Sequence, residues 1–336
     1  MNNTQDEKII SAFLEGRIMG LPEFGRKPEC LQTMISRVFL FSTTVFKLYR
    51  KDSEIFNTLF SDLGGDIRRS FYEEDFFFNH YFNPAVYKFL RGVKVGDGVE
   101  LCEPDDKNAY DLVIQMDRID VRHNLTEQLL NGTLQERDFH KIGYEMTKCI
   151  AEFPYKLKTD KNYYEIYYSF LKDLVGWTDS AAPFIPKEEA RRVFSVLFPY
   201  LEGKKDELSH YTSKDFVSAI DNHSDNVFYK NGELSFIDVY LPKESWRAVM
   251  PSYNSVRLST DIQVLHGKKY ADALLAGYGE YYPEEKRDPG FDMFQKVYMA
   301  LIKGPYLFIM NRESRARHDE AQKYWEFIKK SVAMLE

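Results

Sequence analysis

The sequence has little that would hold a protein together covalently or around a metal. Its 336 residues include three cysteines, Cys30, Cys102 and Cys149, which lie far apart and show no Cys-x-x-Cys or Cys-x-x-His spacing. This argues against a disulfide framework and against a structural zinc site, and it agrees with a reducing cytoplasm.

Signals for membranes, secretion and nucleic acid are also absent. No stretch approaches the ~20 apolar residues that span a bilayer, and the N-terminus lacks the basic and apolar regions of a secretory signal. A formal net charge of -7 argues against nucleic acid as the main partner, because phosphate binding normally requires a clustered excess of lysine and arginine. We therefore expect a cytoplasmic protein with neither a membrane nor a nucleic-acid partner.

Apolar and aromatic residues, in contrast, are plentiful. A hydrophobic content of 44% and an aromatic content of 15% are enough for a large packed core. In the first part of the chain, "ISRVFLF" and "TVFKLYR" predict an antiparallel hairpin, and residues 66–82 predict a helix. Three further strands are predicted at residues 87–95, 99–104 and 110–116.

After Asp117 apolar residues recur at helical spacing over most of the remaining sequence. The sequence therefore predicts an α+β protein in two parts. Residues 1–116 form a small, β-rich N-terminal lobe with one helix, and residues 117–336 form a larger, mainly helical C-terminal lobe.

A lysine in the second predicted strand is the first candidate for a nucleotide site. Lys47 alternates with Phe46 and Leu48, and a lysine on a rigid strand can act as a fixed point charge against phosphates. Such a lysine usually needs a carboxylate on the next helix, for which Glu73 and Glu74 are candidates. The alternatives are a solvated lysine on an edge strand and two glutamates on the wet face of a helix.

The polar segment "SAIDNHSDNVF" leads into a predicted hairpin that ends in "FID". Asp221 could orient or deprotonate a hydroxyl group, whereas Asn226 and Asp238 could supply oxygen ligands to Mg²⁺. The Asn-Gly pair at residues 231–232 predicts the turn of the hairpin. The alternative is a capped turn, because an Asp five residues before an Asn occurs about once by chance in ~300 residues.

The order of these features resembles the aminoglycoside phosphotransferase family of the protein-kinase-like superfamily. The family's loop reads His-Gly-Asp-Leu-His-x-x-Asn and is followed by a strand that ends in Ile-Asp. "LQTMISRVFLFSTTVFKLYRK" resembles more specifically a bacterial branch often fused to a P-loop ATPase domain, although no P-loop motif is present here. The resemblance extends from residue 31 to about residue 310 and implies a protein-kinase-like bilobal fold.

The resemblance also implies roles for individual residues. Lys47 would contact the α- and β-phosphates of ATP or GTP, with Glu73 or Glu74 holding its ammonium group. Asp221 would be the catalytic aspartate. The metal ligands of Mg²⁺ would be Asn226 and Asp238.

Further implied residues surround this set. The loop that covers the phosphates would contain Thr33 and Ser36. The backbone of Gln115 and Asp117 would contact the adenine edge, and the residues that support the catalytic loop would be His223 and Asp261.

Three residues of the loop depart from the family's pattern. Ala219 and Ile220 replace its first histidine and its glycine, which affects loop geometry and rate more than reaction type. Asp225 stands where small residues are usual, and an extra carboxylate could alter metal binding or contact a cationic acceptor.

The expected activity is that of a kinase with an alcohol group as acceptor (EC 2.7.1-like). It would transfer the γ-phosphoryl group of ATP or GTP to a hydroxyl of a small molecule, which could stack on aromatic residues within 163–184. Two alternatives remain open: a catalytically impaired nucleotide-binding protein, and a protein kinase. The lack of an Ala-Pro-Glu segment between Asp238 and Asp261 argues against the second.

Overall fold

The computed structural model describes residues 3–33, 35–52, 65–157, 159–285 and 287–336. The chain divides into two compact units, an N-terminal unit of Met1–Val121 with Phe236–Pro242 and a C-terminal unit of Arg122–Ser235 with Lys243–Glu336. The short segment Phe236–Pro242 therefore packs with the N-terminal unit, whereas the sequence predicts it as part of the C-terminal lobe.

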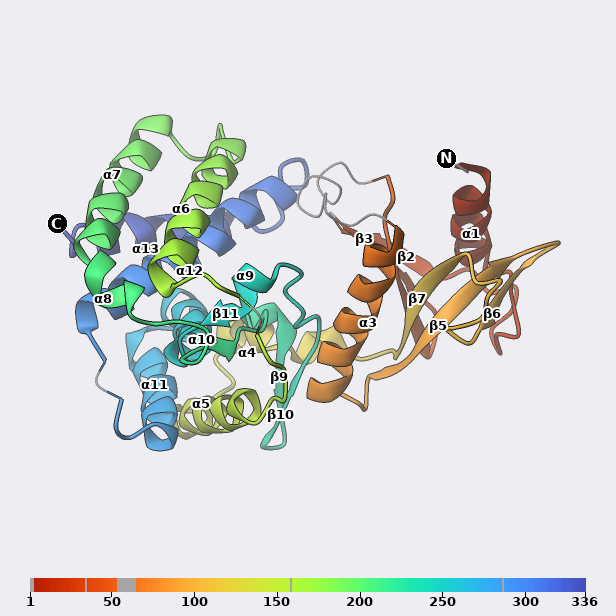
Figure 1. Cartoon of the computed structure of the whole chain (residues 1–336), viewed down its shortest axis with the longest axis horizontal. Coiled ribbons are helices and arrows are strands. Elements are labelled where there is room, and N and C mark those ends of the chain that lie inside the picture. Colours follow the sequence, from red (N-terminus) through yellow and green to blue (C-terminus); the bar gives the residue numbers. More distant parts are fainter. Residues whose placement is uncertain (1–2, 34, 53–64, 158, 286) are drawn as a thin grey trace. The chain divides into compact units, whose positions relative to one another are not determined.

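The N-terminal unit is built on a sheet of seven strands in the described part of the chain (Figure 1). The strands are β1 (Ile18–Met19), β2 (Glu29–Gln32), β3 (Ser36–Leu40), β4 (Thr44–Tyr49), β5 (Tyr87–Val95), β6 (Val99–Cys102) and β7 (Asp111–Asp117). Their order is β1-β6-β5-β7-β4-β3-β2; β1 pairs with β6 in parallel, and the other pairs are antiparallel. Helices α1 (Asn3–Glu15) and α3 (Gly65–Phe82) belong to the same unit.

Most of these elements agree with the pattern of the sequence. The predicted hairpin is confirmed as β3 and β4, the predicted helix as α3, and the three further strands as β5, β6 and β7. Helix α1 and the short strands β1 and β2 were not predicted. The two short strands have too few residues for a period of two to be recognised.

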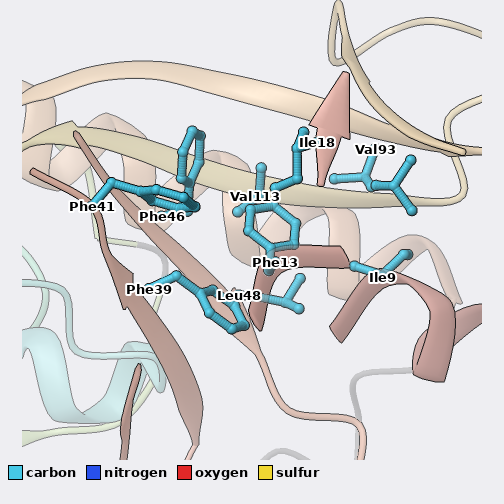
Figure 2. Packing of buried hydrophobic residues seen from close by; sticks show 10 residues of the cluster. Ile9, Phe13, Ile18, Phe39, Phe41, Phe46, Leu48, Val93 and Val113 are labelled. Carbon is cyan, nitrogen blue, oxygen red and sulfur yellow. The ribbon is translucent and has the colours of Figure 1, made fainter. Parts of the chain in front are cut away.

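Strand β4 lies inside the sheet, between β3 and β7, and it is buried on both faces. One face directs Phe46 into an apolar core, which α1 covers with Ile9 and Phe13 (Figure 2). The Phe13 ring stacks on Phe39, with 4.8 Å between the ring centroids.

The opposite face of β4 carries Lys47 and Tyr49 toward α3. The Tyr49 ring packs edge-on against Phe71, with centroids 4.6 Å apart, and its backbone N–H donates to the hydroxyl of Tyr72 at 2.8 Å. Lys47 is therefore a buried residue of an interior strand, which rules out the alternative of a solvated lysine on a sheet edge.

The C-terminal unit is mainly helical (Figure 1). Its described helices are α4 (Leu125–Asn131), α5 (Glu136–Ala151), α6 (Tyr163–Ser180), α7 (Lys187–Gly203), α8 (Lys205–Ser209), α9 (Glu244–Arg247), α10 (Ser252–Leu265), α11 (Lys268–Tyr281), α12 (Pro289–Met310) and α13 (His318–Val332). The 3-10 turns are η1 (Val121–His123) and η2 (Ser224–Asn226). Short strands form two further pairs, β8 (Val217–Ser218) with β11 (Ala248–Val249) and β9 (Val227–Lys230) with β10 (Glu233–Phe236).

The predicted Asn-Gly turn joins β9 to β10. Asn231 and Gly232 have φ angles of 55° and 81°, which are left-handed conformations that favour these two residue types. This turn lets β10 pair with β9, and the chain then continues to Asp238, as the hairpin pattern predicts.

Helices α5 and α11 lie side by side (Figure 1). Gly143 and Gly277 make this close approach possible, because a Cβ atom at either position would come within 2.0 Å of a backbone oxygen of the other helix. No described helix combines the length and the apolar character that crossing a bilayer requires.

The core beneath α1 supports a first prediction. Replacing Phe13 by Ala removes a fully buried ring and leaves a cavity, so urea denaturation should show a loss of about 3–5 kcal/mol in the free energy of unfolding. Phe24 is 58% exposed in the same unit, and Phe24→Ala should change this energy by less than about 0.5 kcal/mol. Equal losses for both variants would contradict the packing of α1 described above.

Candidate functional site

The Lys47 side chain lies between two carboxylates of the N-terminal unit. Its ammonium nitrogen is 3.3 Å from Asp75 Oδ2 and forms a second, shorter ion pair with Asp238 Oδ1. The side chains of Lys47 and Asp75 are 7% and 0% exposed. Burial alone would lower the pKa of Lys47, but Asp238 and Asp75 hold it above its usual value, so the side chain remains a cation.

The partner of Lys47 differs from the one expected. Asp75 holds the ammonium group, whereas Glu73 pairs with Arg69 at 3.0 Å on the exposed side of α3, and Glu74 accepts a hydrogen bond from Tyr240 at 2.7 Å. The prediction that Glu73 or Glu74 holds Lys47 is corrected accordingly. Sequence periodicity did not single out Asp75, because its position belongs to the face occupied by aromatic residues.

Asp75 is itself held in place by two neighbours. Tyr49 donates its hydroxyl hydrogen to Oδ2, and the amide nitrogen of Asn79 lies 2.6 Å from Oδ1. Burial raises the pKa of Asp75, while the nearby Lys47 opposes that shift. Both carboxylate oxygens therefore have a defined donor.

Asp238 follows β10 and has a left-handed backbone conformation, with a φ angle of 51°. Its backbone N–H donates to the hydroxyl of Tyr87 at 2.7 Å. The side chain is 57% exposed, and one of its oxygens contacts Lys47. The carboxylate therefore combines a fixed cation on one side with access to solvent.

The other expected nucleotide residues lie in the sheet of the same unit. Thr33 Oγ1 accepts hydrogen bonds from the backbone N–H groups of Ile35 and Ser36, at 3.2 and 2.9 Å, which closes the turn between β2 and β3. Gln115 pairs with residues of β4 and β5, and the backbone N–H of Asp117 donates to Val86 at 2.8 Å. The contact of these residues with a nucleotide stays a prediction.

In the C-terminal unit, the loop that contains Asp221 is anchored to α10. The backbone N–H of Ile220 donates to Asn254 Oδ1 at 3.0 Å, and that of Ala219 donates to the carbonyl of Arg247 at 2.7 Å. Ala219 and Ile220 are fully buried. These bonds define the loop path without the histidine and glycine that the family pattern places there.

Asp221 forms an ion pair with Arg257, which α10 presents to it from a buried position. The side chains are 27% and 10% exposed, respectively. Sequence reasoning did not identify Arg257. The only local signal is its position four residues before Asp261, on the same face of α10.

Asp261 and His223 lie against the same loop. Asp261 accepts hydrogen bonds from the backbone N–H of Ser224 and from the hydroxyl of Tyr324, both at 2.7 Å. His223 Nε2 lies 3.9 Å from Asp221 Oδ2. Burial and the nearby Lys303 ammonium lower the pKa of His223.

The unusual Asp225 is neutralised within the protein. Lys303 of α12 forms an ion pair with its Oδ2, and Arg317 donates to both carboxylate oxygens at 3.2 and 3.0 Å. Burial alone would raise the pKa of Asp225, but Lys303, His223 and Arg317 lower it well below its usual value. Its carboxylate is therefore already used in holding α12 and the start of α13 to the loop.

The donor chemistry of Asn226 and Asp238 fits Mg²⁺. Asn226 donates its amide nitrogen to the carbonyl of Asp221 at 2.9 Å, which directs the amide oxygen away from that carbonyl. An amide oxygen and a partly exposed carboxylate are hard oxygen ligands of the kind that Mg²⁺ prefers. Within the described ranges, no three His, Cys, Asp or Glu side chains gather into a metal centre by themselves.

The aromatic residues of α6 are mostly core residues. Tyr163 and Tyr167 are fully buried, and their hydroxyl groups are 3.1 Å apart. Tyr167 packs edge-on against Tyr298, with centroids 5.2 Å apart. These contacts describe helix packing, so neither ring is a surface for stacking a ligand.

The ion pairs of Asp225 lead to a pH-dependent prediction. Asp225→Asn leaves the buried Lys303 without a carboxylate partner. The free energy of unfolding at pH 7 should fall by about 2–3 kcal/mol. This is less than the roughly 3–5 kcal/mol lost when a fully buried ion pair is broken, because Asp225 is partly exposed. Because folding lowers the pKa of Asp225, its contribution is present above the unfolded carboxyl pKa of about 4 and is lost as the pH falls through the folded value. Urea denaturation between pH 3 and pH 8 should therefore show wild type and variant converging at low pH.

The exposed Glu313→Gln provides the matched control, with a constant and small difference from wild type across this range. An Asp225→Asn difference that does not depend on pH would contradict the assigned ion pairs.

Sequence comparisons find neither a matching family model nor a matching curated protein. Solved structures do match. The choline kinase LicA from Streptococcus pneumoniae has a TM-score of 0.52 at 13% identity, over 98% of this chain and 100% of that chain. LicA in complex with AMP gives 0.51 at 13% identity, over 93% and 92%.

A structure of APH(2")-IIia with GDP and kanamycin has a TM-score of 0.49 at 10% identity, over 98% of this chain and 96% of that chain. At such low identities, the match to LicA shows the fold. The chain has a protein-kinase-like fold, with an N-terminal unit built on an antiparallel sheet and a helical C-terminal unit, and the expected α+β fold class is confirmed.

Proposed function

We propose that this protein transfers the γ-phosphoryl group of ATP or GTP to a hydroxyl group of a small molecule. The observation that carries the proposal is the buried Lys47 ammonium, held between Asp75 and Asp238. An ammonium group fixed in this way is a point charge suited to binding phosphates. The kinase-like fold favours a nucleotide site over a purely structural ion pair.

On the nucleotide side, Lys47 would bind the α- and β-phosphates while Asp75 keeps its ammonium group on the sheet. The turn closed by Thr33 and Ser36 would cover the phosphates, and the backbone of Gln115 and Asp117 would contact the base. These roles follow from the resemblance of the sequence, and their support in the structure is the placement of all these residues in one compact unit.

On the acceptor side, Asp221 would align the hydroxyl group. The acceptor oxygen forms a bond to the γ-phosphorus, the bond from that phosphorus to the β–γ bridging oxygen breaks, and the nucleoside diphosphate leaves. The proton of the hydroxyl group passes to an Asp221 oxygen. Arg257 holds the other oxygen, so the carboxylate is oriented before the acceptor arrives.

Asn226 and Asp238 are the residues that would hold Mg²⁺. When bound, the ion would neutralise charge on the phosphate oxygens. Asn226 is oriented by its bond to Asp221, and Asp238 by its bonds to Lys47 and Tyr87. These contacts support the proposal, because they orient the two side chains that would bind the ion.

The acceptor is proposed only as a small molecule that bears a hydroxyl group. A location in the cytoplasm remains the expectation drawn from the dispersed cysteines, which are unpaired thiols in the structure.

A first experiment tests the reaction itself. The purified protein, ATP or GTP and Mg²⁺ are incubated with a metabolite pool, and products that gain a phosphoryl group are detected by mass spectrometry. Asp221→Asn should lower the rate by about 10²–10⁴-fold, because it removes the proton acceptor and the alignment of the hydroxyl group. Product formation that is unchanged in Asp221→Asn would refute the role of Asp221.

If no pool yields a product while ATP still binds, the protein is a nucleotide-binding protein without transfer activity. Phosphorylation of added proteins but of no metabolite would identify a protein kinase instead.

A second experiment separates Asp75 from its neighbour on α3. Asp75→Asn removes a charge-assisted contact of Lys47 worth about 1.5–3 kcal/mol, so the dissociation constant of ATP should rise roughly 10- to 100-fold by titration calorimetry. Glu73→Gln is the matched control, because the Glu73 carboxylate pairs with the exposed Arg69 and not with Lys47, so this variant should bind ATP like wild type. The reverse order of effects would restore Glu73 as the partner of Lys47.

A further inference from the structure

A row of buried polar side chains follows the inner face of helix α3 and continues to the residue just after its end. Asp75, Asn79 and Asn83 follow one another at intervals of four residues and are 0%, 0% and 7% exposed. Burying polar groups among aromatic residues is unfavourable unless each group is hydrogen-bonded. The row therefore requires specific partners, and these lie in the segment 236–239 and around Lys47.

Asn79 is the member of the row whose side chain hydrogen-bonds both to Asp75 and to the backbone of the segment 236–239. Its amide nitrogen donates to Asp75 Oδ1 at 2.6 Å and to the carbonyl of Asp75 at 2.9 Å. Its amide oxygen accepts from the backbone N–H of Val239 at 2.9 Å. Because the nitrogen faces two acceptors and the oxygen faces a donor, the partners allow one amide orientation.

The bond to Val239 affects the neighbouring Asp238. A left-handed conformation at a residue other than glycine is strained and persists only where the surroundings hold it. The N–H of Asp238 is bound by Tyr87, the N–H of Val239 by Asn79, and the carbonyl of Phe236 by Asn83 at 2.9 Å. Side chains from α3 and its C-terminal flank thus supply two of these three bonds.

The bond to Asp75 affects the other carboxylate of the pair. Tyr49 and Asn79 each donate to one oxygen of Asp75, so the carboxylate cannot rotate without losing a bond. In this position its Oδ2 faces the Lys47 ammonium group at 3.3 Å. The Asn79 amide therefore bonds to Asp75 on one side and to the backbone beside Asp238 on the other. Asp75 and Asp238 are the two carboxylates that flank Lys47.

We propose that Asn79 is a positioning residue that couples Asp75 to Asp238, so that both carboxylates face Lys47 in a fixed geometry. It does so through the Asp75 side chain on one side and the Val239 backbone on the other. The consequence for nucleotide binding rests on the proposed function, whereas the coupling itself is a property of the N-terminal unit.

The coupling is tested without a nucleotide by amide hydrogen exchange of the full chain, followed over peptides that contain residues 236–240. Asn79→Leu keeps the branched shape and the number of heavy atoms of Asn but has no donor or acceptor, so exchange at the Val239 amide should accelerate at least about tenfold. Asn79→Asp keeps an acceptor for Val239 but replaces the amide donor to Asp75 by a carboxyl group, which repels the Asp75 carboxylate or shares a proton with it. Protection of Val239 should therefore be retained in this variant.

The matched control is Thr178→Val. Thr178 is 1% exposed, and its hydroxyl donates to the carbonyl of Leu174 in its own helix at 2.8 Å. It should leave exchange at residues 236–240 unchanged. Equal exchange of this segment in Asn79→Leu and wild type, or equal acceleration in Thr178→Val, would overturn the coupling.

Nucleotide affinity is the second measurement, made below the melting temperature of every variant. Both Asn79 variants lose the amide donor to Asp75 and should raise the ATP dissociation constant about tenfold, while Thr178→Val should not. Unchanged ATP affinity in both Asn79 variants overturns the positioning role. A wild-type protein that binds neither ATP nor GTP refutes the proposed function instead, and the exchange experiment still decides the coupling.

Discussion

Removing a lysine ammonium from water costs several kcal/mol, so a protein that buries one has to surround it with charge and hydrogen bonds. In the N-terminal unit this constraint organises β4, α3 and the segment after β10 around Lys47. Asp75 and Asp238 supply the charge. Tyr49 and Asn79 bind the Asp75 carboxylate, and Tyr87 binds the Asp238 backbone. The segment 236–242 packs with this unit because its backbone bonds to α3 and to the flanking Tyr87 and Asn83.

In the C-terminal unit, charged and hydrogen-bonding side chains likewise surround Asp221 and its loop. Helix α10 contributes Asn254, Arg257 and Asp261, which bind the loop backbone, the Asp221 carboxylate and the Ser224 amide in turn. Lys303 and Arg317 also hold the loop, because both form ion pairs with Asp225. The residues at positions 219 and 220 do not have to brace the loop themselves, because α10 and the carbonyl of Arg247 already do so.

Several features could be predicted because they depend on residues close together in the sequence. Alternation in "TVFKLYR" predicts a strand that contains Lys47, and the Asn-Gly turn predicts the hairpin before Asp238. Other features depend on contacts between side chains whose arrangement in space the sequence pattern does not give. Glu73, Glu74 and Asp75 are adjacent acidic residues on one helix, and only the packing of α3 on β4 shows that the third one faces the lysine. Arg257 and Lys303 meet the loop from helices that begin more than 25 residues after it.

The sequence by itself determined the α+β character, the order of the longer strands and helices after α1, and the residue types that a phosphate and an oxygen-bound cation require. These follow from local periodicity, turn chemistry and side-chain chemistry. Tertiary structure decided which carboxylate pairs with Lys47, which arginine holds Asp221, and that Asp225 is neutralised internally. The reason is physical: charge pairing in a low-dielectric interior depends on distances of a few ångströms between segments far apart in the chain, and local sequence patterns carry no information about those distances.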